Sequence, residues 1–165
     1  MKNLWAPWRM EYIVGPKPDT CVFCIGQDRA DDPDNLVLMR GRTCFVTMNK
    51  YPYACGHLLI VPLRHVSALN ELGAEERHEL MDLADLSAKA LEQAFSPQGI
   101  NMGMNMGEAA GAGIEAHLHM HLVPRWNGDH SFMAVFGATM ILSEHLDSQY
   151  KRLSRFFRSG SQGIA

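Results

Sequence analysis

The chain has 165 residues and a formal net charge of −3, with 47% hydrophobic and 20% charged residues. This is the profile of an ordinary globular protein, and the length suffices to bury a core without disulfides. The acidic balance argues against a broad electrostatic contact with nucleic acid or with a membrane surface. No apolar run approaches the ~20 residues that span a bilayer, and the aromatic, proline-containing start does not suit a signal peptide. We therefore expect a cytoplasmic protein that binds neither nucleic acid nor membranes.

The first distinctive segment, Val14 to Asn35, is rich in glycine, proline and aspartate, which predicts irregular structure. It contains the C-x-x-C pair Cys21 and Cys24, whereas Cys44 and Cys55 lie singly in apolar surroundings. A pair of cysteines supplies half of a tetrahedral zinc site. The alternatives are two buried thiols or a thioredoxin-like redox pair, although no βαβ pattern surrounds the motif.

The remaining elements follow in a regular order. From Ala74 to Phe95, apolar residues recur at three- and four-residue spacing, which predicts one long helix that stops at Ser96-Pro97-Gln98-Gly99. A second helix is predicted from about Ser143, which is a suitable N-cap. Strands are expected at Leu36–Met39, Cys44–Met48, His57–Pro62, Ile100–Met106 and His117–Pro124. This order predicts an α+β fold with a mainly antiparallel sheet, and we expect residues 1–165 to form a single domain.

Two groups of residues in these elements are interpreted as structural. The alternating methionines of the fourth strand are expected to fill the core. The charged residues that begin the long helix are expected to lie in solvent, where the acidic ones also suit the helix dipole. The first group is Met102, Met104 and Met106, and the second is Glu75, Glu76, Arg77 and Glu79.

Three histidines at spacing two, His117, His119 and His121, are the strongest signal in the chain. On a strand they would point to one face, ~7 Å apart, with the intervening apolar residues on the other face. A neutral imidazole is a nucleophile near neutral pH because its ordinary pKa is about 6.5. Attack on phosphorus would replace one difficult substitution by two easier ones, and the glycine-rich segment Gly107–Gly113 would offer backbone N–H groups to phosphate oxygens. The alternative is that the histidines merely line a polar face of the sheet.

The run His117-Leu118-His119-Met120-His121-Leu122-Val123 resembles the signature of the histidine triad (HIT) family, in which histidines alternate with apolar residues. The resemblance covers about residues 4 to 155 and includes Asn49, Gly56-His57 and the continuation Pro124-Arg125-Trp126-Asn127-Gly128-Asp129. The start Leu4–Met10 and the Gly-Asp after the triad are most similar to the bacterial and archaeal branch related to diadenosine tetraphosphate phosphorylases.

This resemblance implies a HIT-like fold and a homodimeric enzyme that cleaves dinucleoside polyphosphates at the α-phosphorus, with water or phosphate as acceptor. His119 would be the nucleophile that forms a nucleotidyl-histidine intermediate. His121 would contact the α-phosphate and assist the leaving group, and His57 would support the triad from a neighbouring strand. The implied substrate contacts are Asn49 at the ribose, Asn105, Gly111, Gly113 and Ile114 along the phosphates, and His121.

The resemblance also implies a structural Zn²⁺ site, in which His65 and His117 complete the set begun by Cys21 and Cys24. Such a site would tie the irregular segment, about residues 14–35, to the catalytic strand. Three alternatives remain open. They are a nucleoside phosphoramidate hydrolase, a zinc-stabilised nucleotide-binding module without turnover, and a zinc-ribbon nucleic-acid binder, against which the acidic balance counts.

Overall fold

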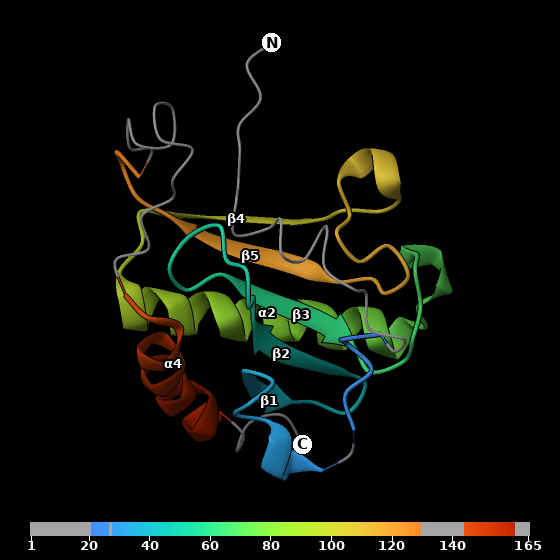
Figure 1. Ribbon diagram of the computed structural model, residues 1–165, viewed down its shortest axis with the longest axis horizontal. Coiled ribbons are helices and arrows are strands. Elements are labelled where there is room, and N and C mark those ends of the chain that lie inside the picture. Colours follow the sequence, from blue (N-terminus) through green and yellow to red (C-terminus); the bar gives the residue numbers. More distant parts are fainter. Residues whose placement is uncertain (1–20, 27, 130–143, 161–165) are drawn as a thin grey trace.

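The computed structural model describes residues 21–26, 28–129 and 144–160 (Figure 1). Its centre is a five-stranded sheet in the order β1-β2-β3-β5-β4, in which every neighbouring pair is antiparallel. The strands are β1 (Val37–Arg40), β2 (Cys44–Met48), β3 (Leu58–Pro62), β4 (Gly99–Met104) and β5 (Met120–Arg125). The helices are α2 (Ala74–Phe95), α4 (Leu146–Gly160) and the short 3-10 helices η1 (Arg29–Asp31), η2 (Leu69–Glu71) and η3 (Glu108–Ala110). This arrangement confirms the α+β prediction.

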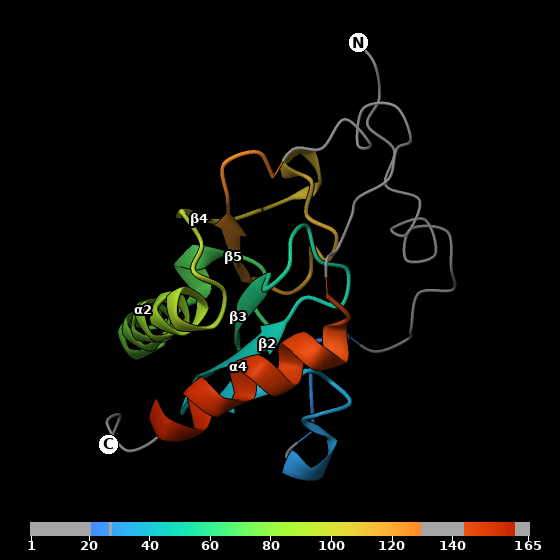
Figure 2. The same ribbon diagram turned by 90° about the vertical axis from the view of Figure 1, so that its left-hand side faces the viewer.

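The sheet packs apolar residues on both faces, since every residue of β2 and β3 is buried. The larger cluster lies between one face and the helices α2 and α4, which also contact each other. In Figure 1, α2 lies behind the strands and α4 lies beside β1 at the edge of the sheet; Figure 2 shows the same arrangement from the side. A smaller cluster covers the opposite face and consists of Phe23, Val37, Phe45, Leu59 and Val61.

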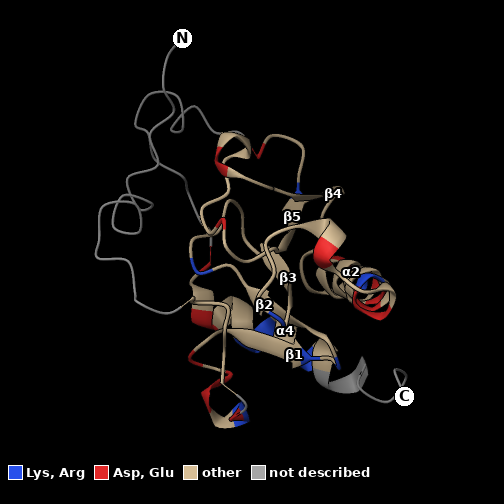
Figure 3. Cartoon of the chain, turned by 90° about the vertical axis from the view of Figure 1, so that its right-hand side faces the viewer, with Lys and Arg blue, Asp and Glu red and all other residues tan. Residues whose placement is uncertain are grey.

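Helix α2 has the bounds that the hydrophobic spacing predicts. The Glu76 carboxylate accepts the backbone N–H of Gly73 at 2.7 Å and so caps the first turn. Ser96 ends the helix with a left-handed φ of 48°. Figure 3 shows acidic and basic residues interspersed along α2, whose apolar side packs on the sheet. No helix in the described ranges is long and apolar enough to cross a bilayer.

Several strand ends shift from their predicted positions by one or two residues, and two element starts shift further. Strand β5 begins at Met120 and not at His117, because the backbone N–H of Leu118 donates to the Val66 carbonyl at 2.6 Å and so leaves the ladder with β3. Helix α4 begins at Leu146, where the His145 carbonyl accepts the first helical N–H groups; Ser143, the predicted N-cap, lies outside the described residues. The predicted apolar side of α4 joins the larger cluster through Leu146, Tyr150, Leu153 and Phe157.

The expectation that the three alternating methionines fill the core is wrong for two of them. Met102 is 52% exposed and Met106 is 49% exposed, whereas Met104 packs against the larger cluster. For Met102 the reason is topological, because β4 is the edge strand beyond β5 among the described strands, and no periodicity in its own sequence indicates that position. Met106 lies beyond the end of β4 at Met104.

The expectation that Glu79 lies in solvent is also wrong. Its side chain is buried and accepts backbone N–H groups of Arg42 at 2.7 Å, Thr43 at 2.5 Å and Cys44 at 3.0 Å, as well as the Thr43 hydroxyl. Burial raises the pKa of the Glu79 carboxyl, but these hydrogen bonds outweigh it and leave the pKa below its ordinary value. Glu79 therefore anchors the β1–β2 turn to α2.

We expect Glu79→Gln to lower the free energy of unfolding by about 2 kcal/mol, because an amide loses the charge and turns one NH₂ group toward backbone donors. Urea denaturation measures the effect, and Glu75→Gln at an exposed position of the same helix is the matched control. Since folding lowers this carboxyl's pKa, its contribution is complete well above the ordinary value of 4.5 and is lost as the pH falls. Equal stability of the two variants at pH 7 would contradict this role.

Candidate active site

The pairing of β3 with β5 brings two of the predicted histidines together. His57 directly precedes β3, and its Nε2 lies 2.9 Å from Nδ1 of His121 on β5. The backbone N–H of Tyr53 donates to Nδ1 of His57 at 3.0 Å, and the Asn49 amide nitrogen lies 3.3 Å from the same atom. Because Nδ1 accepts, the proton of a neutral His57 is on Nε2 and is donated to His121. His121 in turn accepts at Nδ1, which places its own proton on Nε2.

His119 has the opposite arrangement of its ring proton. Its Nδ1 lies 2.8 Å from the backbone oxygen of His117 and donates to it, which leaves the lone pair on Nε2. The ring is buried, and this burial lowers the pKa of His119 despite the hydrogen bond to the backbone oxygen. The neutral, nucleophilic form therefore predominates at neutral pH.

The histidine row is more compact than a regular strand predicts. The ring centroids of His119 and His121 are 4.8 Å apart and the planes meet at 62°, compared with the expected spacing of ~7 Å. Phe23 packs against the ring of His119 with 5.0 Å between centroids. The rings of His119 and His121 are thus adjacent, and a single phosphoryl group can reach both.

His117 belongs to a different cluster from its two neighbours in the run. It is fully buried, and its Nε2 donates to the Pro62 carbonyl at 2.8 Å, so that its Nδ1 lone pair faces the cysteines. This nitrogen lies 3.4 Å from Sγ of Cys21 and 3.8 Å from Sγ of Cys24. Burial lowers the pKa of His117, which keeps the ring neutral as a metal ligand must be.

His65 completes this cluster from the segment after β3. Its Nδ1 lies 3.2 Å from Sγ of Cys24, and the ligand atoms of Cys21, Cys24, His65 and His117 all lie within 4.8 Å of one another. Burial and the adjacent Cys21 raise the pKa of the Cys24 thiol. A nearby cation would favour the thiolates instead, so this set could hold a metal ion. The structure brings together all four residues predicted for a metal.

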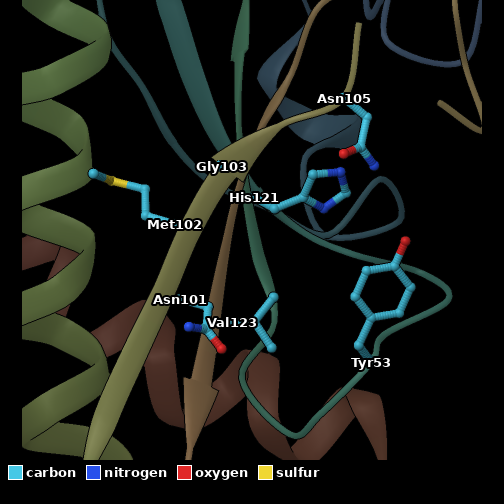
Figure 4. Close-up of a pocket in the computed structure, with 7 residues that line it drawn as sticks. All are labelled: Tyr53, Asn101, Met102, Gly103, Asn105, His121 and Val123. Atoms are coloured by element: carbon cyan, nitrogen blue, oxygen red, sulfur yellow. The ribbon is translucent and has the colours of Figure 1, made fainter. Parts of the chain in front are cut away.

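A pocket of about 210 Å³ lies along β4 and β5 beside His121. The described residues that line it are neutral or weakly basic, with no lysine or arginine: Tyr53, Asn101, Met102, Gly103, Asn105, His121 and Val123. In Figure 4, Asn105, His121 and Tyr53 extend to the same side of the sheet, whereas Met102 points toward α2. Asn105, predicted from the resemblance, thus lines the same pocket as His121.

The other residues predicted to contact substrate lie around this centre. Asn49 contacts His57, as described above. Gly111, with a φ of 78°, and Gly113 are exposed in the loop between β4 and β5, whereas Ile114 packs against the smaller apolar cluster. None of these three is among the described residues that line the pocket.

Sequence reasoning missed Tyr53, Asn101, Val123 and Phe23 as neighbours of the site. Tyr53 lies in an irregular segment without periodicity, and Asn101 and Val123 need the β4–β5 register to be placed opposite each other. Phe23, between the two cysteines, is the exception, because a large apolar residue within the C-x-x-C motif indicates packing toward the site.

Comparisons with known proteins agree with this geometry. The family model of the HIT domain matches residues 30–128. The AP-4-A phosphorylase of Mycobacterium tuberculosis is 34% identical over 154 residues, which cover 88% of this chain and 79% of that protein. The asymmetrical bis(5'-nucleosyl)-tetraphosphatase of Schizosaccharomyces pombe is 26% identical over 129 residues, covering 78% of this chain and 67% of that protein.

Solved structures share the fold. A Zn-bound histidine triad family protein from Mycobacterium smegmatis has a TM-score of 0.66 at 21% identity, covering 87% of this chain and 96% of that one. A hypothetical histidine triad nucleotide-binding protein from Sulfolobus tokodaii has a TM-score of 0.63 at 23% identity, covering 87% and 93%. The resemblance noted in the sequence is thereby confirmed, and the chain belongs to the HIT family of enzymes.

Proposed function

We propose that this chain is a cytoplasmic hydrolase or phosphorylase that cleaves dinucleoside polyphosphates, such as diadenosine tetraphosphate, at the α-phosphorus. The observation that carries the proposal is the hydrogen bonding of two adjacent rings, from which we infer complementary protonation. Nδ1 of His119 donates to a backbone oxygen, which leaves a nucleophilic Nε2, whereas His121 accepts from His57 and keeps a proton on Nε2. A nucleophile and an acid with ring centroids 4.8 Å apart suit an in-line displacement at phosphorus.

The reaction takes two steps. Nε2 of His119 attacks the α-phosphorus, forming an N–P bond, while the P–O bond to the rest of the polyphosphate breaks and its electron pair passes to the leaving oxygen. His121 gives its Nε2 proton to that oxygen. The negative charge that develops on the His121 ring is stabilised by the N–H that His57 donates to Nδ1 of His121. Water or inorganic phosphate then attacks the same phosphorus and gives a proton back to Nε2 of His121. The N–P bond breaks, and its electron pair returns to Nε2 of His119.

The substrate contacts follow the same geometry. We assign Asn105 to the phosphate chain, because it lines the pocket beside His121. Asn49, which contacts His57, is assigned to the ribose, and the backbone of Gly111, Gly113 and Ile114 to the phosphates. The named activities of the M. tuberculosis and S. pombe relatives support dinucleoside polyphosphates as the substrate class.

Zinc is the metal that we assign to the cysteine–histidine cluster. Bond lengths of about 2.0–2.3 Å in a tetrahedral site place neighbouring ligand atoms about 3.3–3.8 Å apart. The ligand-atom distances of 3.2, 3.4 and 3.8 Å in the cluster fit this geometry. Four protein ligands would close the site, so the ion would be structural and would hold Phe23 against His119. The thiols of Cys21 and Cys24 stay reduced in the cytoplasm, which suits this assignment.

We also propose that the enzyme is a homodimer. Strand β4 is an edge of the sheet, and Met102 on this strand is 52% exposed. Met102 points toward α2 in Figure 4. Met81, a residue of α2, is 49% exposed. Within the described ranges no strand pairs with this side of β4, and an edge beside exposed apolar side chains suits contact with a second copy of the chain.

The function is tested by product analysis. Diadenosine tetraphosphate is expected to yield AMP and ATP in water, and ADP and ATP if inorganic phosphate is the acceptor. A series of dinucleoside tri-, tetra- and pentaphosphates, each with and without phosphate, identifies the preferred substrate and acceptor. Exclusive turnover of an adenosine phosphoramidate would contradict the proposed substrate, and ligand-induced stabilisation without any product would indicate a binding module.

A further inference from the structure

The segment between β2 and β3 places an aromatic ring over the histidine pair. The Tyr53 ring is 4.6 Å from the His57 ring between centroids, with the planes at 40°. It is 5.8 Å from the His121 ring, with the planes within 17° of parallel. Tyr53 also lines the pocket beside His121 (Figure 4). A single side chain thus contacts both rings of the hydrogen-bonded pair His57 and His121, called the histidine pair below.

The segment that carries Tyr53 is anchored on both sides. The backbone N–H of Tyr51 donates to the Asn49 side chain at 2.9 Å. At the other end, the N–H of Gly56 donates at 2.7 Å to Gln149, which is fully buried on α4. Gly56 has a φ of 78°, and an added Cβ would lie 3.0 Å from Leu91 and Phe95. The core therefore fixes the place from which the Tyr53 ring reaches the histidines.

Tyr53 acts on the histidine pair in two ways. Its backbone N–H donates to Nδ1 of His57, which determines that His57 donates from Nε2. Its ring packs on the face of His121 and restricts rotation about χ2, a torsion that is otherwise broad. We propose that Tyr53 is a positioning residue that aims the Nε2 proton of His121 at the leaving oxygen, an inference that rests on the proposed function.

This role has a specific chemical consequence. A polyphosphate oxygen that leaves as the P–O bond breaks is stabilised by the proton of His121, whereas a nitrophenolate leaves without one. Loss of the Tyr53 ring should therefore slow cleavage of diadenosine tetraphosphate much more than cleavage of a p-nitrophenyl ester of a nucleoside monophosphate. A smaller amount of folded protein lowers both cleavage rates by the same factor, so the ratio of the two rates stays constant.

The test compares Tyr53→Leu, which keeps the backbone N–H but removes the ring, with Tyr53→Phe, which keeps the ring. We expect Tyr53→Leu to lower kcat for diadenosine tetraphosphate by about tenfold or more, with little change in KM, and to lower kcat for the nitrophenyl ester by less than about twofold. Tyr53→Phe should keep the wild-type ratio of the two rates. Equal losses on both substrates in Tyr53→Leu would overturn the proposal.

A second measurement does not need turnover and separates this inference from the proposed function. Long-range ¹H–¹⁵N NMR correlations report which ring nitrogen of each histidine is protonated. We expect protonated Nε2 in His57 and His121 of the wild type and of Tyr53→Phe, and averaged nitrogen shifts for His121 in Tyr53→Leu. Unchanged His121 shifts in Tyr53→Leu would contradict the positioning role even if the enzyme is active, and absence of turnover by the wild type would contradict only the proposed function.

Discussion

His119→Ala is expected to lower kcat for diadenosine tetraphosphate by about 10⁴-fold or more while nucleotide affinity changes only a few-fold. The substitution removes the Nε2 lone pair that forms the N–P bond, and it leaves the proposed substrate contacts of Asn49, Asn105 and His121 in place. Water would have to attack the α-phosphorus directly, in one step with a poorer nucleophile. Single-turnover kinetics measure the chemical step, and isothermal titration with a non-hydrolysable analogue measures the affinity.

The control for this variant is His78→Ala, since His78 is exposed on α2, away from the histidine cluster. It should retain wild-type kinetics. After a neutral quench, intact-mass analysis of the wild type should show one added nucleotidyl group, and peptide mass analysis should locate it on the peptide that contains His119. The alanine variant should show none. Activity of His119→Ala within tenfold of the wild type would remove this residue from the nucleophile's role.

Loss of the cysteine–histidine site is expected to have the largest effect on stability. We expect the purified chain to contain one zinc ion and Cys21→Ser to contain none. Its free energy of unfolding should fall by about 4 kcal/mol, the contribution of a ligand present at about 1,000 times its dissociation constant. Without the ion, the segment that includes Phe23 loses its link to His65 and His117. Metal analysis and urea denaturation measure the two effects.

Cys55→Ser is the matched control, because Cys55 lies outside the four-residue cluster. It should keep one zinc per chain. Because the proposed mechanism gives the ion no chemical step, the folded fraction of Cys21→Ser should keep most of its kcat at saturating substrate. A zinc content near zero in the purified, unchelated wild type would contradict the assignment of the cluster to zinc.

The long helix and the central strands could be predicted because the apolar residues within each of them follow a recognisable pattern. Residues 74 to 95 have an apolar stripe and an end signal, so the bounds of α2 are those expected. Strand β2 is likewise found where predicted. The four residues predicted to bind a metal also lie together in the structure. Sequence spacing alone predicted only the cysteine pair, and the resemblance supported the two histidines.

The remainder depends on contacts that no local pattern encodes. The spacing of the three histidines predicts that they share one face of a strand. The hydrogen bond between Leu118 and Val66, however, means that residues 117 to 119 are not paired with β3. His117 consequently faces the cysteines while His119 and His121 stay together. Glu79 follows other charged residues on α2, and only the approach of the β1–β2 turn shows that it is buried.

The stereochemical course at the α-phosphorus tests the two-step displacement most directly. A dinucleoside polyphosphate made chiral at that phosphorus by sulfur and an oxygen isotope is cleaved, and the configuration of the nucleotide product is determined. Each in-line displacement inverts the phosphorus, so attack by His119 followed by attack of water or phosphate predicts overall retention. Overall inversion would mean that the acceptor attacks in a single step, and would contradict a covalent intermediate on His119.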